Sequence, residues 1–257
     1  MVPPILKLSA PIVLVPGLRW CDPFFSQRRP SVELFPGVRH ILESAGNRVL
    51  TARVSPTASV ATRAAELKAF LQSNVGSQPV HLIGHSMGGL DARYMISRLG
   101  MDRQVRSLTS VATPHRGTTF ADWFLRRFAR YVSPLFRALG IPDDGVFDLT
   151  TDACQRFNES VPNAPTVRYA SVAGVCTKPW LGPEWALSSG IVTKAEGPND
   201  GVVSVASAAW GVQNDVWIGD HLNVVNWPNR LMKKAGAWHD RAGDYGQLLN
   251  QLARIES

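Results

Sequence analysis

A serine flanked by glycines directly follows a short apolar run in this chain. Residues 82–94 read LIGHSMGGLDARY, and GHSMG at residues 84–88 matches the pattern G-x-S-x-G. In that pattern a strand turns sharply into a helix, and the turn holds the serine hydroxyl above the edge of a sheet. Gly84 and Gly88 suit the turn because a Cβ atom at either position would collide with the neighbouring chain. Ser86 is therefore our candidate nucleophile, and an ordinary turn with an unreactive serine is the alternative.

A serine hydroxyl at its ordinary pKa needs a neighbouring base before it can attack, and histidine is the usual base. His221, in the sequence GDHLNVVNW, lies in a predicted loop late in the chain, which fits the order serine, acid, histidine. His239, in a mixed polar segment near the C-terminus, is a weaker alternative. Of the remaining histidines, His85 lies inside the turn and His81 lies in a predicted buried strand. His40 and His115 come before any suitable acid in the chain.

The base in turn needs a carboxylate that orients its ring. Asp200 stands in the sequence GPNDGVVSV, a turn that we expect immediately before a strand, where it would lift the carboxylate to the sheet edge. Asp220 is adjacent to His221 and is poorly placed to fold back onto its neighbour's ring. The alternative for Asp200 is a residue that only shapes its turn, because Asn-Asp-Gly sequences are common in turns.

Backbone N–H groups are the expected donors of an oxyanion hole. One is that of Met87, the residue after the candidate nucleophile. The other is that of Leu18, in the turn PGLRW that follows the first apolar run. Leu18 is also suited to plug this turn with its hydrophobic side chain, and the two roles are compatible.

The elements that must position these residues alternate between strands and helices, which predicts an α/β fold with a mostly parallel sheet covered by helices on both faces. The predicted strands are Ile12–Pro16, Arg48–Val54, Pro79–Gly84, Val105–Pro114, Thr166–Gly174 and Val202–Ala208. The predicted helices are Val32–Ala45, Ser59–Gly76 and Met87–Gly100.

Residues 116–165 break this alternation and predict a helical cap, or lid, inserted over the sheet edge of a single domain spanning residues 1–257. Within the insertion, Phe120–Leu139 has aromatic residues at helical spacing between arginines. This segment predicts either a lid that makes transient contact with a lipid interface or an ordinary helix with a buried stripe.

The composition indicates a globular protein. The chain has 257 residues, of which 45% are hydrophobic and 18% charged, as in globular proteins. The net charge of +7 is spread along the chain without a recognition module, which predicts a solvated basic face, attraction to anionic lipid next, and no nucleic-acid partner. No apolar run is long enough for a transmembrane segment.

The N-terminal residues and the cysteines indicate the cellular compartment of the protein. The N-terminal residues do not read as a signal peptide, although a removed leader would allow secretion. Three cysteines without C-x-x-C spacing predict no metal site and a reduced, cytoplasmic protein.

Several sequence blocks together resemble one family. The blocks are PIVLVPGL, GHSMGG, ATPHRGT, NDGVVSV and DHLNVVN, and they resemble the bacterial triacylglycerol lipases and esterases of the α/β-hydrolase superfamily. The resemblance implies a serine carboxylic-ester hydrolase that cleaves lipidic esters through an acyl-enzyme intermediate, with a mobile helical lid and no cofactor. It assigns the nucleophile to Ser86, the acid to Asp200, the base to His221 and the oxyanion donors to Leu18 and Met87.

Four positions of this chain depart from the pattern of that family. The first strand ends in Pro16-Gly17 where these lipases usually have His-Gly. Secreted relatives often hold calcium with aspartates at two positions that are Asn223 and Lys178 here, which argues against such a calcium site. The cysteine that some secreted relatives carry soon after the acid is Ala206. The absent calcium ligands and cysteine favour an intracellular relative.

The same residues would also serve an acyltransferase, a phospholipase or a thioesterase, because these enzymes share the triad chemistry. Outside the enzymes, the alternative is a silent hydrolase fold that only binds a ligand.

Overall fold

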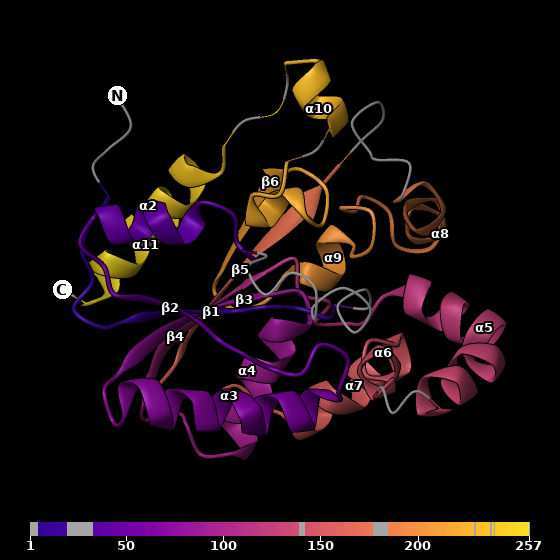
Figure 1. Cartoon of the computed structure of the whole chain (residues 1–257), viewed down its shortest axis with the longest axis horizontal. Helices are drawn as coiled ribbons and strands as arrows, with labels where there is room; N and C mark the ends of the chain where they lie inside the picture. The colour runs from indigo at the N-terminus through magenta and orange to yellow at the C-terminus, as the bar shows by residue number, and fades with distance from the viewer. Residues whose placement is uncertain are drawn as a thin grey trace.

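The computed structural model describes residues 5–19, 33–138, 142–176, 185–228, 230–236, 238 and 240–256. Within them, six strands form one sheet in the order β2-β1-β3-β4-β5-β6, and every neighbouring pair is parallel (Figure 1). The strands are β1 (Ile12–Val15), β2 (Val49–Thr51), β3 (Val80–His85), β4 (Val105–Val111), β5 (Arg168–Val175) and β6 (Gln213–Ile218). The predicted parallel sheet is confirmed, and parallel strands place all their carboxyl ends at one edge.

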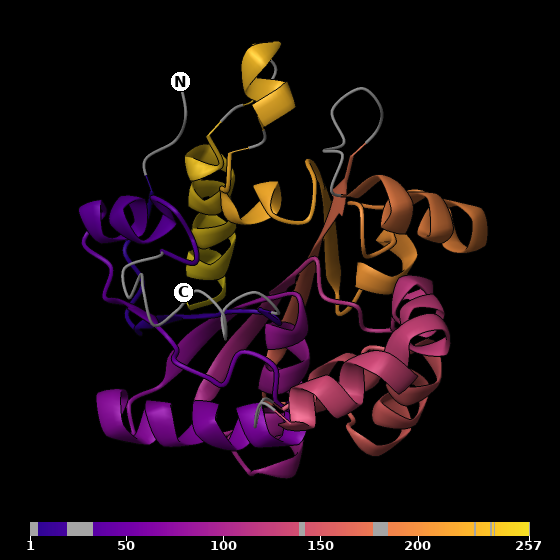
Figure 2. The same cartoon turned by 45° about the vertical axis from the view of Figure 1, so that its right-hand side comes forward.

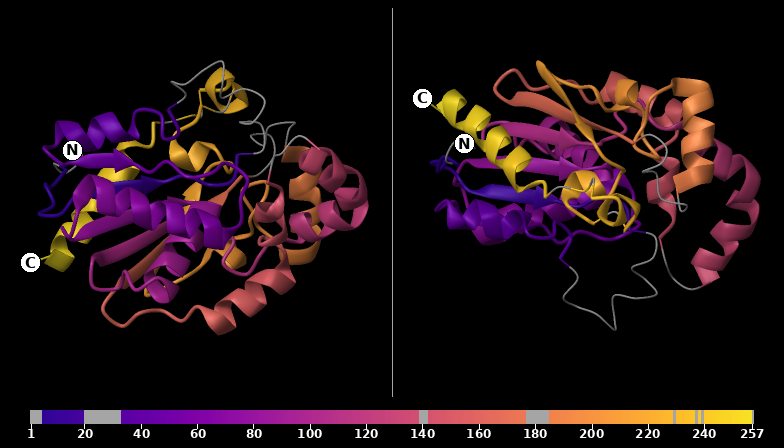
Figure 3. Two further views of the ribbon diagram at one scale, coloured as in Figure 1. Left: turned by 60° about the horizontal axis from the view of Figure 1, so that its bottom comes forward. Right: turned by 90° about the horizontal axis from the view of Figure 1, so that it is seen from above.

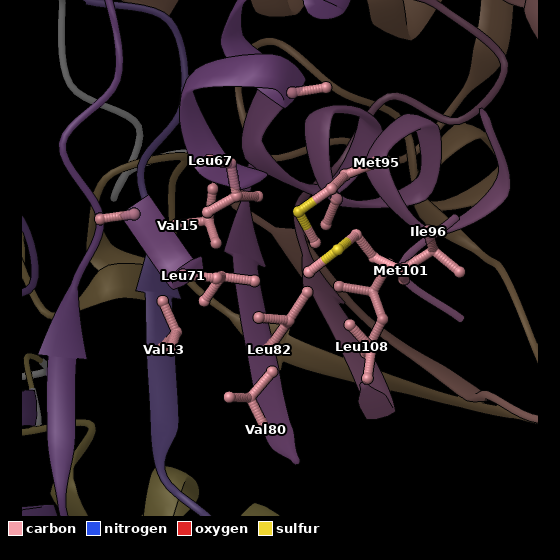
Figure 4. Packing of buried hydrophobic residues seen from close by; sticks show 14 of the residues in the cluster. Val13, Val15, Leu67, Leu71, Val80, Leu82, Met95, Ile96, Met101 and Leu108 are labelled. Carbon is pink, nitrogen blue, oxygen red and sulfur yellow. The ribbon is translucent and has the colours of Figure 1, made fainter. Parts of the chain in front are cut away.

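Helices cover both faces of the sheet, as predicted (Figures 1 and 3). On one face lie α3 (Val60–Val75) and α4 (Met87–Arg98), whose leucines and methionines pack on the strands (Figure 4). On the other face lie α2 (Val38–Ser44) and α11 (Ala242–Glu256), which share a second buried apolar cluster with the strands.

Capping residues explain where the helices begin and end. Ser59 caps α3 by accepting a hydrogen bond from the backbone N–H of Thr62, and the helix ends at Gly76, which has a φ of 60°. Among the described residues, α2 begins only at Val38, because Gly37 before it has a φ of 72° that no helix accommodates.

The prediction of a strand at Val202–Ala208 is wrong. Ser204 accepts a hydrogen bond from the backbone N–H of Ser207 at 3.0 Å and caps a short helix, α9 (Val205–Ala208). The sixth strand is instead β6, which the sequence analysis missed. It is an edge strand with alternating exposure, and Val216 and Ile218 are more than half exposed, so its sequence lacks the continuous apolar run of a central strand.

The segment predicted as a cap is helical in its described part. It contains α5 (Thr119–Ala138), α6 (Asp144–Phe147) and α7 (Thr151–Ser160), which lie together on one side of the molecule beside α8 (Ala186–Glu196) (Figure 2). Its buried residues form one apolar cluster with the first residues of α3 and α4: Val60, Met87, Leu90, Ala121, Val146, Leu149 and Cys154. This segment therefore packs against Met87, the residue that follows Ser86.

The C-terminal part after β6 contains the 3₁₀ turn η2 (Asn223–Val225) and the short helix α10 (Arg230–Lys234) before α11. Across the described ranges, no helix is both long and apolar enough to cross a membrane.

Candidate active site

The turn between β3 and α4 consists of one residue, Ser86. Its φ of 52° and ψ of −129° are rare for a residue other than glycine. The backbone N–H of Ser86 donates to the carbonyl of Val111 at 2.9 Å, and the N–H of Gly89 donates to the carbonyl of Ser86 at 3.1 Å. These two bonds fix the turn between two strand ends and the first turn of the helix.

The glycines around Ser86 are required by space. A Cβ atom on Gly84 would lie 2.8 Å from the backbone nitrogen of Gly89, and one on Gly88 would lie 2.5 Å from the carbonyl oxygen of Val15. Real Cβ atoms do not approach backbone atoms this closely, so only glycine fits. The sequence-based assignment of this turn to Gly84 and Gly88 thus has a steric reason.

The structure brings Ser86, His221 and Asp200 together from three loops at the carboxyl edge of the sheet. The Oγ of Ser86 lies 3.0 Å from Nε2 of His221, and Nδ1 of His221 lies 2.7 Å from Oδ2 of Asp200. The carboxylate only accepts hydrogen bonds, so Nδ1 carries the proton and donates it. Nε2 is then left as an acceptor for the serine hydroxyl.

Asp200 is fully buried and uses both of its carboxylate oxygens. Oδ1 accepts from the backbone N–H groups of Val202 at 3.0 Å and Val203 at 2.8 Å, which is the turn-shaping role. Its backbone carbonyl accepts from the N–H of His221 at 2.8 Å. The two roles considered for Asp200, shaping its turn and orienting the histidine, fall to the two oxygens of one carboxylate. Oδ1 shapes the turn, and Oδ2 accepts from the imidazole.

The environment of His221 favours its protonated form. Burial lowers the pKa of His221, but the negative charge and hydrogen bond of Asp200, with a further contribution from Asp220, outweigh burial and raise it above the ordinary 6.5. An imidazole of this kind accepts a proton readily from a hydroxyl and is stabilised as the cation beside Asp200.

His85 contacts the backbone of His221, which sequence reasoning missed. Its Nε2–H donates to the carbonyl of His221 at 2.9 Å, and the two rings lie 4.8 Å apart. Burial and the nearby charge of His221 lower the pKa of His85 to about 3, so its ring is neutral and one nitrogen donates. His85 therefore supports the loop of His221 instead of titrating with it.

The turn after β1 passes directly beside Ser86. A Cβ atom on Gly17 would lie 2.6 Å from Cβ of Ser86 and 3.2 Å from its Oγ. The next residue, Leu18, packs its side chain into the apolar cluster of Met87. Met87 is the first residue of α4, where a backbone N–H has no partner within the helix. Both candidate oxyanion donors thus belong to backbone segments adjoining the serine hydroxyl.

A buried arginine that the sequence analysis did not single out supports this turn. Arg63 on α3 donates from Nη2 to the carbonyl of Pro16 at 2.6 Å and from Nη1 to the carbonyl of Ser55 at 2.5 Å. It also forms a fully buried ion pair with Asp91 on α4 at 2.7 Å. One guanidinium therefore joins the turn after β1 to the helix that follows Ser86. The signal in the sequence was a charge on the apolar face of a predicted helix.

The other histidines have structural partners or lie away from the site. Nδ1 of His81 lies 2.7 Å from the hydroxyl of Ser107, and Nε2 of His115 lies 2.8 Å from that of Ser110. His40 is exposed on α2. The weaker candidate, His239, falls outside the described residues.

The position expected for a calcium ligand in secreted relatives is engaged by an arginine. Oδ1 of Asn223 accepts from Nη2 of Arg241 at 2.9 Å. Lys178, at the other position, is not among the described residues. Over the part of the chain that the structure describes, no group of three or more His, Cys, Asp or Glu side chains is arranged to hold a metal ion.

The sequence is similar to a known domain family and to named lipases. The sequence profile of the PGAP1-like alpha/beta domain matches residues 62–232. Triacylglycerol lipase 2 of Saccharomyces cerevisiae is 34% identical over 213 residues, which cover 78% of this chain and 64% of the yeast protein. A triacylglycerol lipase of Vibrio cholerae is 28% identical over 254 residues, covering 84% of this chain and 79% of that protein.

The similarity extends to solved structures. The Staphylococcus hyicus lipase superimposes with a TM-score of 0.72 at 21% identity, covering 100% of this chain and 98% of that chain. The chain spans 64% of the length of the yeast relative and about a third of two further curated triacylglycerol lipases. The predicted resemblance to lipases is confirmed. The chain is a member of the PGAP1-like alpha/beta domain family and has the α/β-hydrolase fold of lipases and esterases.

Proposed function

We propose that this protein is a serine carboxylic-ester hydrolase that cleaves lipidic esters. One observation carries the proposal: the continuous chain of contacts from Oγ of Ser86 through the ring of His221 to Asp200, at 3.0 Å and 2.7 Å, beside a turn that exposes the serine. The named function of the yeast and Vibrio relatives supports the same reaction class.

The proposed reaction has two acyl-transfer steps. His221 accepts the hydroxyl proton at Nε2 while Oγ of Ser86 attacks the ester carbonyl, and Asp200 remains ionised and stabilises the imidazolium. Backbone N–H groups of Met87 and Leu18 receive the developing oxyanion. His221 then returns the proton to the leaving alcohol, and the same ring activates a water molecule that releases the acid. No step requires a metal or a cofactor.

We further propose that residues 116–165 are a cap on a single domain spanning residues 1–257, and that Phe120–Leu139 makes transient contact with a lipid interface. The described part of α5 supports this proposal. Phe128 and Tyr131 are exposed, and the neighbouring exposed residues are arginines: Arg126, Arg127 and Arg130. Aromatic and cationic side chains on one helix are the combination that binds the headgroup region of a membrane.

The same triad would serve an acyltransferase, a phospholipase or a thioesterase, and the choice of acyl acceptor and leaving group distinguishes them. A silent binding protein is the alternative outside the enzymes, and the intact contacts of Ser86 argue against it. A cytoplasmic location also remains a proposal. Cys154 is a buried free cysteine, which is compatible with a reducing compartment; cell fractionation tests this location.

The deciding experiment is a series of dissolved p-nitrophenyl esters and emulsified triglycerides of increasing chain length, measured with the wild-type protein and Ser86→Ala. We expect hydrolysis by the wild type and a loss of about 10⁶ in rate for Ser86→Ala, because removing the nucleophile disables the whole triad. Ser44→Ala, which changes an exposed serine on α2, is the matched control and keeps the wild-type rate. Hydrolysis that survives in Ser86→Ala refutes the proposal.

A further inference from the structure

A buried arginine lies beneath the loop that carries His221. Arg241 is only 2% exposed and stands directly before α11, where its carbonyl accepts the first hydrogen bond of the helix from Tyr245 at 3.0 Å. Arginine is almost never fully buried unless its guanidinium is paired. The partners of this guanidinium therefore indicate what it does.

Nη2 of Arg241 bonds both sides of the His221 loop. It donates to the carbonyl of Ile218, three residues before His221, and to Oδ1 of Asn223, two residues after it, at 2.9 Å. The approach is close, because a Cβ atom on Gly219 would lie 2.7 Å from Nη2. One nitrogen thus fixes the separation between the entry and the exit of the loop.

Further bonds join the same loop to α11. The backbone N–H of Arg241 donates to Oδ1 of Asn226 at 2.8 Å, and the hydroxyl of Tyr245 donates to the carbonyl of Val224 at 3.1 Å. Nη1 of Arg241 pairs with Asp244 at 2.8 Å, which balances the buried charge. Residues 218–226 are therefore hydrogen-bonded to the start of α11 on one side, while His221 contacts Ser86 on the other.

We propose that Arg241 is a positioning residue that holds the 218–226 loop so that Nε2 of His221 points at Ser86. The inference rests on the proposed role of His221. Only a planar cation with several N–H groups in a fixed fork can serve a carbonyl, an amide oxygen and a carboxylate together, and a lysine ammonium lacks that shape. Without the guanidinium, the two ends of the loop lose their common donor, and His221 loses its fixed position.

The central variant is Arg241→Ala, assayed with a short dissolved ester. Misplacing a catalytic group by about 1 Å costs roughly 10²-fold, so we expect kcat to fall about 100-fold while KM changes less than about twofold. Guanidinium ion at tens of millimolar should restore part of kcat by entering the vacated space. Urea, which has the shape without the charge, and ammonium, which has the charge without the shape, should restore none.

Two further variants separate positioning from stability. Arg39→Ala removes an exposed arginine of an ion pair on α2 and keeps the wild-type kcat. Arg241→Lys retains the charge and replaces Arg241→Ala in the experiment if Arg241→Ala does not fold. We expect the kcat of Arg241→Lys to be lower than that of the wild type even at temperatures well below its Tm, where the variant is folded. A wild-type kcat in a folded Arg241→Ala or Arg241→Lys, or a loss that follows only the unfolded fraction, overturns the proposal.

A spectroscopic readout separates this inference from the proposed function. The Nδ1–H proton that His221 donates to Asp200 gives a low-field proton resonance, whatever the activity. We expect this resonance in the wild type and Arg39→Ala and its loss or broadening in Arg241→Ala. A wild type that shows the resonance but hydrolyses no ester defeats the proposed function alone. A resonance that is unchanged in Arg241→Ala defeats the positioning role alone.

Discussion

The backbone of Ser86 adopts a conformation that costs a non-glycine residue of the order of 1–3 kcal/mol. Its φ of 52° is maintained because the bonds to Val111 and Gly89 leave the chain no other path between β3 and α4. The consequence is a hydroxyl that stands beside His221 and the turn at Gly17. At this scale, function depends on a few atoms whose positions are set by the lack of space for any Cβ around them.

The raised pKa of His221 predicts the pH dependence. The base must be neutral to accept a proton, so kcat/KM should rise as pH increases through a pKa above 6.5 and then level off. Asp200→Asn removes the charge that raises the pKa, so the rise should move to lower pH and the plateau should drop about 10⁴-fold. A pH profile of both proteins with a dissolved ester is the measurement, and an unmoved profile in Asp200→Asn contradicts this account.

The close approach of Gly17 to Ser86 predicts the effect of one methyl group. In Gly17→Ala the new Cβ would lie 2.6 Å from Cβ of Ser86, so the turn with the Leu18 N–H must move. We expect turnover to fall about 10²–10³-fold, as when an oxyanion donor is lost, with the Tm changed by only a few degrees. Gly190→Ala in α8, where a Cβ meets no atom within 4 Å, is the control and keeps full turnover. Equal turnover in both variants would show that the turn is not part of the site.

At the scale of elements, buried charges connect segments that the sheet alone does not hold together. Arg63 joins α3 to the turn after β1 and to Asp91 on α4. A buried pair adds little net stability when intact, but its disruption leaves one charge without a partner. Such pairs therefore fix the relative positions of elements more than they strengthen the fold.

This pair predicts a large stability effect for one substitution. Arg63→Leu should lower the free energy of unfolding by about 3–5 kcal/mol, because the buried Asp91 carboxyl, whose pKa burial already raises to about 7, and the carbonyls of Pro16 and Ser55 all lose their donor. Adding Asp91→Leu should recover part of the loss, with the bonds to the Pro16 and Ser55 carbonyls still missing. Urea unfolding measures both. Breaking the exposed Arg39–Glu43 pair should cost no more than about 1 kcal/mol, and a similar cost for Arg63→Leu would contradict the role of the buried pair.

The sequence predicted elements well where each has a local signal. The helix over α3 has a capping serine and a terminal glycine, and the central strands are continuous apolar runs. It failed for β6 and α9, because an edge strand shows only half of the apolar pattern and a four-residue helix depends on one serine cap. Arg63 and Arg241 were missed because several of their partners lie far along the chain, such as the Pro16 carbonyl for Arg63 and the Ile218 carbonyl for Arg241, and no local pattern reveals such pairs.

At the scale of the whole molecule, the parallel sheet explains how candidate site residues far apart in the sequence lie together. The loops of Ser86 and His221 follow β3 and β6, and parallel strands end at one edge. Asp200 lies at the same edge because the N–H of Cys176, directly after β5, donates to the carbonyl of Asn199 at 2.9 Å. The G-x-S-x-G motif, the Asn-Asp-Gly turn and the order serine, acid, histidine together selected Ser86, Asp200 and His221 as candidates, although Asp200 precedes a helix and not the predicted strand. The distances between them needed the structure.

The excess positive charge predicts binding of the protein to anionic lipid through the arginines of α5. Each arginine near an anionic surface contributes about 1 kcal/mol, so replacing three on α5 by serine should weaken vesicle binding by about 3 kcal/mol, roughly 100-fold. The residues are Arg126, Arg127 and Arg130. Binding is measured with phosphatidylglycerol vesicles at low salt, and hydrolysis of a dissolved short ester should stay unchanged.

The control for this prediction replaces three exposed arginines outside residues 116–165, Arg53, Arg98 and Arg103, with serine, so that the net charge changes equally. We expect those vesicles to bind the control variant far more tightly than the α5 variant. Equal weakening in the two variants would mean that overall charge, and not α5, attracts the protein to lipid.

The central claim is that Ser86 is a nucleophile activated by His221, and labelling with a fluorophosphonate tests it most directly. The reagent forms a stable bond only with an activated serine, and mass spectrometry locates it. We predict one adduct per folded chain, on the peptide containing Ser86, and none on denatured protein or on Ser86→Ala. An unlabelled folded wild type, or an adduct on any other serine, would contradict the account.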